Sequence, residues 1–181
     1  MTLPVCVDPR RHDAVLFDLE DPARFGPVAH LARRCGDAGV AVAGYSADPR
    51  CRQALRDSGI DHLFEVGLAD QHEASAGPIS GGLLQAARRL DVSPGRCVVV
   101  DFSAAGVAAA RTGGFAFVVG VDANGNGDEL ARRGADVVLA DLSEIAVRNG
   151  DRRISELPNA LASYGQLVGI AGARGAMVFL D

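Results

Sequence analysis

Residues 97–121, CVVVDFSAAGVAAARTGGFAFVVGV, contain the pattern that decides the fold. Two apolar runs, 97–102 and 115–121, flank an alanine-rich segment with helical character at 104–112. Near-continuous apolar runs of this length are typical of strands that are buried on both faces. A strand, a helix and a second strand in succession predict a parallel β-α-β unit with a right-handed crossover.

The same alternation extends over most of the chain. Further buried strands are predicted at 13–19 (DAVLFDL), 40–45 (VAVAGY), 136–142 (DVVLADL) and, more weakly, 62–66 (HLFEV). Further helices are predicted at 23–38, 49–58, 80–91 and 128–133. The sequence therefore predicts an α/β fold with a Rossmann-like core, in which a parallel sheet of about six strands has helices on both faces.

Composition restricts the class of protein. The chain has 181 residues, 48% of them hydrophobic, which is enough for one sizeable core. The net charge is -5, and the 18 basic residues, all of them arginine, are dispersed along the chain. This distribution argues against nucleic acid and anionic membranes as partners. The four cysteines form no CxxC pair and no apolar run is long enough to span a membrane, so we expect a soluble, cytoplasmic protein.

Acidic residues follow two of the predicted strands, where ligands bind in open α/β sheets. Asp18 and Glu20 close the first strand, and Asp101 closes the strand at 97–102. The run 13–20 resembles the first motif of the haloacid dehalogenase (HAD) superfamily, an Asp-x-Asp. The resemblance makes Asp18 the phosphate-accepting nucleophile and Glu20, in place of the second Asp, the acid/base.

The run 92–144 is similar to the C-terminal half of the β-phosphoglucomutase-like branch of that superfamily. The resemblance implies a HAD core, in which an inserted cap domain usually follows the first motif. Only 25 residues separate Asp18 from Gly44, enough for one helix and a turn. We therefore expect a HAD core without a cap domain.

Three positions depart from the pattern that this resemblance implies. The phosphate-binding Ser/Thr falls on Gly44, although Ser46 lies two residues further on, and the phosphate-neutralising Lys falls on Gly77. The paired acids that hold Mg²⁺ fall on Asp101 and Phe102, which leaves Asp18 and Asp101 as metal ligands. Because phosphoryl transfer depends on electrostatic stabilisation, these losses together predict a rate lower by several orders of magnitude.

Three interpretations of Asp18 and Asp101 stay open at this point. They can be strand-end acids that accept hydrogen bonds from loop amides, remnants of a Mg²⁺ or phosphate site, or working catalytic groups. A related possibility is an anion site formed by helix N-termini with Ser46, Ser103 and Arg50, which would sense a sugar phosphate without hydrolysing it.

The segments 7–18, 95–100, 141–157 and 178–181 together resemble the N-terminal extension of long-form trehalose-6-phosphate phosphatases. In that form a degenerate, capless HAD-like domain precedes the catalytic HAD domain. The resemblance implies a HAD-like domain at 1–153, followed by an amphipathic helix and linker at 154–175. It also implies that 176–181 is the first strand of a following domain, with Asp181 at its nucleophile position.

The expected function is therefore that of a non-catalytic module. It would dock on or regulate a catalytic phosphatase domain that follows in the same polypeptide and converts trehalose 6-phosphate and water to trehalose and phosphate. No cofactor is expected in this chain, whereas the parent enzyme would use Mg²⁺. The alternative is a small capless Mg²⁺-dependent phosphatase with Asp18 as nucleophile, Glu20 as acid/base and Asp101 as metal ligand.

Overall fold

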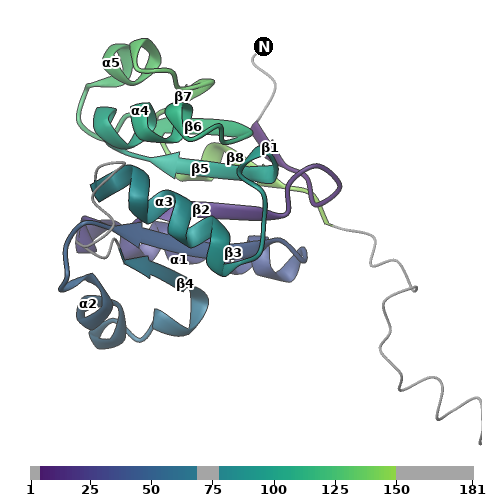
Figure 1. Cartoon of the computed structure of the whole chain (residues 1–181), viewed down its shortest axis with the longest axis vertical. Helices are drawn as coiled ribbons and strands as arrows, with labels where there is room; N and C mark the ends of the chain where they lie inside the picture. Colours follow the sequence, from purple (N-terminus) through teal and green to yellow (C-terminus); the bar gives the residue numbers. More distant parts are fainter. Residues whose placement is uncertain (1–4, 69–77, 150–181) are drawn as a thin grey trace, which may run out of the picture. The chain divides into compact units, whose positions relative to one another are not determined.

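A parallel six-stranded sheet forms the centre of the protein in the computed structural model, which describes residues 5–68 and 78–149 (Figure 1). The strands lie in the order β4-β3-β2-β5-β6-β7, and every neighbouring pair is parallel. Their bounds are β2 Ala14–Asp18, β3 Ala41–Ser46, β4 Glu65–Leu68, β5 Cys97–Asp101, β6 Phe117–Val121 and β7 Val137–Leu139. The prediction of an α/β fold with about six parallel strands is confirmed.

Helices cover both faces of this sheet (Figure 1), and the side chains of the strands point alternately to the two faces. In β2, Val15 and Phe17 belong to the core under α1 and α2, whereas Ala14 and Leu16 belong to the core under the other three helices. Full burial of a side chain such as Phe17 contributes about 1.5–3 kcal/mol. The helices are α1 Phe25–Asp37, α2 Cys51–Asp57, α3 Pro78–Arg89, α4 Ala104–Thr112 and α5 Gly127–Arg132.

Short 3₁₀ turns adjust the boundaries that periodicity predicts. They are η1 Pro22–Arg24, η2 Asp61–Leu63, η3 Pro94–Arg96 and η4 Leu142–Glu144. The strand predicted at 62–66 is placed too early, because η2 occupies its first residues and β4 begins only at Glu65. The apolar run at 115–121 likewise begins as a loop, and β6 starts at Phe117.

A second, two-stranded sheet escapes sequence analysis. β1 (Val5–Val7) pairs in parallel with β8 (Ile145–Val147), so the two ends of the described chain come together (Figure 1). The Arg148 guanidinium lies 2.8 Å from the Asp8 carboxylate at the end of this pairing. Strands of three residues carry no measurable period, and their pairing joins segments that are far apart in the sequence.

The connection between β2 and β3 contains only η1 and α1, which confirms that no cap domain is inserted there. Within 5–68 and 78–149 no helix is both long and apolar enough to cross a membrane. The predictions for Gly77, 154–175, 176–181 and Asp181 lie outside the described residues.

Candidate functional site

The two strand-end acids meet at the carboxyl edge of the sheet. Asp18 is the last residue of β2 and Asp101 the last residue of β5, and these two strands pair in parallel in the middle of the sheet. The two carboxylates lie close enough that the charge of Asp101 raises the pKa of Asp18. The structure thus brings together two carboxylates that sequence analysis selected independently.

Asp18 is held by backbone amides. Its Oδ1 accepts a hydrogen bond from the Glu20 N–H at 2.9 Å, and the carboxylate also accepts one from the Phe102 backbone. Burial, followed by the neighbouring charge of Asp101, raises the pKa of Asp18 to about 7, although the two amides act in the opposite direction. Near neutral pH a large fraction of Asp18 is therefore protonated.

Asp101 is more deeply enclosed, with 1% of its surface exposed. Its Oδ1 accepts hydrogen bonds from the Ser103 N–H at 2.7 Å and from the Ser103 hydroxyl at 2.9 Å. Its Oδ2 accepts a hydrogen bond from the Tyr45 hydroxyl. Burial raises the pKa of Asp101, while the hydrogen bonds from Tyr45 and Ser103 lower it in part. Both oxygens of this carboxylate are therefore occupied by protein donors.

Tyr45 is the site residue that sequence analysis missed. It lies on β3 in register with Asp18, and its side chain reaches Asp101 on the far side of β2. Burial and the Asp101 charge raise its pKa well above the usual value, so the hydroxyl keeps its proton and donates. Only the position of Tyr45 at a strand end could have drawn attention to it.

A glycine makes room for this buried carboxylate. A Cβ on Gly106, in the first turn of α4, would overlap with the Asp101 carboxylate. Ser103 begins the same helix, and its Oγ accepts the Gly106 N–H at 3.0 Å. Ser103 thus uses its hydroxyl both as the N-cap of α4 and as a donor to Asp101, which leaves it engaged within the protein.

Neither of the positions expected to bind phosphate, Gly44 and Ser46, offers a free hydroxyl. A Cβ on Gly44 would overlap with the Leu19 side chain, which is buried and fills the space beside β3. Ser46 is 3% exposed, and its Oγ accepts the Asp48 N–H at 3.0 Å. Within the described residues, no hydrogen bond joins Ser46 to Asp18 or to Asp101. Gly44 therefore has no hydroxyl to offer a phosphate. The Ser46 hydroxyl is engaged in a hydrogen bond within the loop after β3.

Glu20, the expected acid/base, ties two loops together. Its Oε1 accepts the Ala47 N–H at 3.2 Å, so the loop after β2 is connected to the loop after β3. Its charge also raises the pKa of Asp18 and of Asp101. Glu20 thus lies near both acids, and its charge opposes their ionisation.

The position of the second expected metal ligand is occupied by an aromatic ring. The Arg24 guanidinium carbon lies 4.4 Å from the centroid of the Phe102 ring, which is a cation–π contact. Arg24 Nε donates to Asp21 Oδ2 at 2.9 Å, and Asp21 caps η1 by accepting the Ala23 N–H. The chain after β2 therefore places an arginine over the residue that replaces the acid.

The residues present do not fit a Mg²⁺ site of the HAD type. Mg²⁺ requires near-octahedral oxygen ligands, but Phe102 offers only a ring, and both oxygens of Asp101 already accept hydrogen bonds. No group of three or more His, Cys, Asp or Glu side chains in the described ranges is arranged to hold a metal. We therefore assign no chemistry to a metal at this site.

Solved structures with a similar fold are HAD proteins. A HAD family hydrolase from Deinococcus radiodurans, solved with bound phosphate and sodium, matches with a TM-score of 0.58 and 20% identity, over 86% of this chain and 97% of that one. A β-phosphoglucomutase from Clostridium difficile matches with a TM-score of 0.56 and 20% identity, over 79% of this chain and 57% of that one. At this identity the matches establish the fold.

Proteins from mycobacteria are similar to this chain over most of its length. No protein-family model matches the chain. A trehalose-phosphate phosphatase from Mycobacterium leprae is 45% identical over 99% of this chain and 42% of its own length. The Mycobacterium tuberculosis protein of the same name is 43% identical over 98% of the chain and 36% of its own length. An uncharacterized glycosyl hydrolase from M. tuberculosis is 40% identical over 85% of the chain, which is 12% of that protein.

The chain thus spans less than half the length of the phosphatases that it matches. Its fold matches HAD hydrolases, and its sequence matches trehalose-phosphate phosphatases. The chain has a HAD-like fold and is similar, over nearly its whole length, to part of the trehalose-phosphate phosphatases of mycobacteria.

Proposed function

We propose that this chain is a non-catalytic HAD-like module of a trehalose-phosphate phosphatase. In this proposal it docks on, and regulates, a catalytic phosphatase domain in the same polypeptide, and Mg²⁺ serves that domain and not this one. The observation that carries the proposal is the hydrogen bonding of the Asp101 carboxylate. Its two oxygens accept hydrogen bonds from Tyr45 and Ser103, where a working enzyme needs a free metal ligand.

Electrostatics supports the same conclusion. A carboxylate nucleophile must be ionised, and positive charge must offset the incoming phosphate. The chain has no lysine, and burial beside Asp101 raises the pKa of Asp18 to about 7. A phosphate dianion at this site would therefore meet the carboxyl groups of Asp18, Glu20 and Asp101, and the chain has no lysine to offset its charge.

The relatives support the proposal because the region similar to this chain occurs in proteins of more than one kind. The region similar to this chain makes up 42% of a trehalose-phosphate phosphatase and 12% of a much longer protein named as a glycosyl hydrolase. A domain that accompanies such different partners is better explained by docking or regulation than by one fixed reaction. We extend the phosphatase setting to this chain because that match covers 99% of it.

Phosphatase activity is the first test. The chain is incubated with p-nitrophenyl phosphate in millimolar Mg²⁺, with Asp18→Asn as the baseline, and Mg²⁺ binding is measured by calorimetry. We expect no phosphate release above this baseline and no Mg²⁺ binding tighter than millimolar. Release that Asp18→Asn abolishes would establish the alternative, a small capless Mg²⁺-dependent phosphatase that uses Asp18, Glu20 and Asp101.

Regulation is tested in a longer polypeptide that carries this module before a phosphatase domain. The intact protein is compared with a version that begins near Gly172, and kinetics, melting temperature and oligomeric state are measured in both. We expect at least one of these properties to change, because a short tether holds two domains at millimolar effective concentration. Identical values for all three properties would refute the regulatory role.

A further inference from the structure

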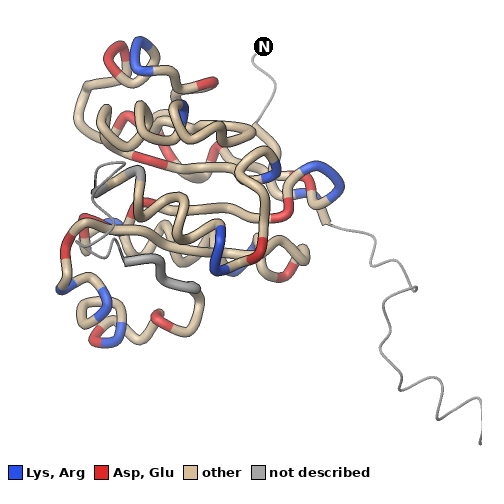
Figure 2. The backbone as a smooth tube through the Cα atoms, in the orientation of Figure 1, with Lys and Arg blue, Asp and Glu red and all other residues tan. Residues whose placement is uncertain are grey.

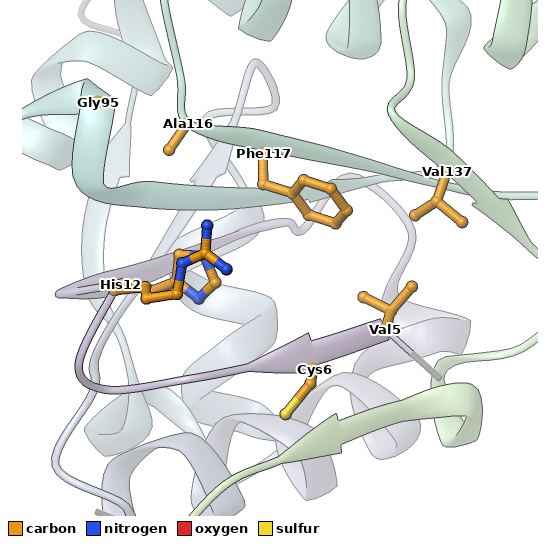
Figure 3. Close-up of a pocket in the computed structure, with 8 residues that line it drawn as sticks. Val5, Cys6, His12, Gly95, Ala116, Phe117 and Val137 are labelled. Carbon is orange, nitrogen blue, oxygen red and sulfur yellow. The ribbon is translucent and has the colours of Figure 1, made fainter. Parts of the chain in front are cut away.

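A cavity of about 520 Å³, shown in Figure 3, lies where the strands of the parallel sheet begin, at the opposite edge from the acids. Its wall includes Phe117 and Val137, the first residues of β6 and β7, and Val5 of the small sheet. Asp18 and Asp101, in contrast, are the last residues of their parallel strands. A volume in this range is typical of pockets for small molecules. The cavity is lined by Val5, Cys6, Arg11, His12, Gly95, Ala116, Phe117 and Val137.

One side of this cavity is apolar. Val5, Phe117 and Val137 pack against the core beneath α1 but remain partly exposed. Figure 3 shows that their side chains converge on one side of the cavity, with His12 on the other. Partly exposed apolar side chains that converge in a hollow provide surface that an apolar ligand would bury.

The polar side of the cavity carries the positive charge of Arg11, although the chain has a net charge of -5. Four arginines gather near the loop from β1 to β2, where Figure 2 shows basic residues clustered: Arg10, Arg11, Arg96 and Arg148. Two acids of the described residues lie in this region, and both are paired, Asp8 with Arg148 and Asp13 with Arg96. Arg11 has neither an ion pair nor a side-chain hydrogen bond within the described residues, so its charge is available.

The loop that carries Arg11 and His12 is held by hydrogen bonds to Asp8. The Asp8 carbonyl accepts the Arg11 N–H at 2.9 Å and the His12 N–H at 2.8 Å. The Asp8 N–H donates to His12 Nδ1 at 3.1 Å, which assigns the proton of a neutral imidazole to Nε2. Burial and the Arg11 charge lower the pKa of His12, in agreement with a neutral ring that donates from Nε2.

We propose that this cavity is a binding site for a small organic anion whose head group is a phosphate or a carboxylate on an apolar body. Arg11 binds the head group, and His12 Nε2 supplies a second donor. The body of the ligand lies against Val5, Phe117 and Val137. The site does not rest on the proposed function of the chain, because it shares no residue with the carboxyl edge of the sheet.

The test is a titration of the ¹⁵N-labelled full chain with phenyl phosphate and with benzoate, followed by NMR. We expect the amides of His12, Gly95 and Phe117 to shift with both ligands, and those of Asp18 and Asp101 to stay in place. Inorganic phosphate, which lacks the body, and benzyl alcohol, which lacks the charge, should each bind at least about tenfold more weakly.

Arg11→Gln is the decisive variant, because Arg11 is exposed and its loss should not disturb the fold. We expect it to weaken phenyl phosphate binding by about tenfold or more, whereas Arg52→Gln, at an exposed arginine on α2, should leave binding unchanged. Equal affinity of the two variants, or no shifts in the cavity, would overturn the proposal. Shifts confined to Asp18 and Asp101 would also overturn it and would indicate instead that phosphate binds at the degenerate HAD site.

Discussion

Replacing Asp18 by asparagine is expected to stabilise the protein at neutral pH. Burial and the Asp101 charge raise the pKa of Asp18 from 3.8 to about 7. A group whose pKa is higher in the folded state binds protons more tightly there, so the free energy of unfolding falls as pH rises from about 4 to about 7. Asparagine keeps the shape of the side chain but cannot ionise. The free energy of unfolding of the variant therefore does not fall through this group as pH rises.

The expected magnitude follows from the same groups. A pKa that rises from 3.8 to about 7 corresponds to roughly 4 kcal/mol. Part of this free energy depends on Asp101, whose charge acts on Asp18. In addition, asparagine offers one acceptor oxygen to the amides of Glu20 and Phe102, whereas aspartate offers two. We therefore expect Asp18→Asn to raise the free energy of unfolding by about 1–3 kcal/mol near pH 7.5 and to have little effect near pH 4.

The assay is urea unfolding followed by circular dichroism at about pH 4 and about pH 7.5. The control is Asp37→Asn, an exposed acid at the end of α1, which should change the free energy of unfolding by less than about 0.5 kcal/mol at either pH. A stability gain for Asp18→Asn that does not grow with pH, or a loss at about pH 7.5, would refute the reasoning. It would mean that Asp18 is ionised at little cost, as a catalytic nucleophile must be.

Three further substitutions test the packing around the same acids. Tyr45→Phe removes the hydroxyl that donates to Asp101 and should lower the free energy of unfolding by about 1.5–3 kcal/mol, measured by urea unfolding near pH 7.5; an unchanged value would mean that Asp101 needs no donor. Gly44→Ser restores the phosphate-binding hydroxyl but must displace Leu19, so we expect a loss of about 1–3 kcal/mol and no gain in phosphate binding by calorimetry; tight phosphate binding would contradict this account. Gly106→Ala forces the Asp101 carboxylate to move and should lower the melting temperature by several degrees, at about 2–4 °C per kcal/mol, in differential scanning calorimetry; an unchanged melting temperature would show that the carboxylate can turn away freely.

Much of the fold was readable from the sequence. Near-continuous apolar runs identified the strands, because strands buried on both faces in a parallel sheet have no polar side. Their alternation with helical segments predicted a parallel sheet covered on both faces. The strand predicted at 62–66 was placed too early because a 3₁₀ turn precedes β4. The sequence also identified Asp18 and Asp101 as strand-end acids, and the absence of lysine followed from composition alone.

Only the tertiary structure determined the surroundings of those acids. Tyr45 and Asp101 are 56 residues apart, and they meet because β2 lies between β3 and β5 and the tyrosine side chain is long enough to reach across it. The order of strands is set by packing over the whole sheet, so no local pattern encodes this contact. The pairing of β1 with β8 has the same origin, and so does the cavity beside it, whose lining comes from segments between Val5 and Val137. Local sequence specifies which residues form a strand, whereas contacts between distant segments, which depend on how the strands are assembled, determine the surroundings and the charge state of each side chain.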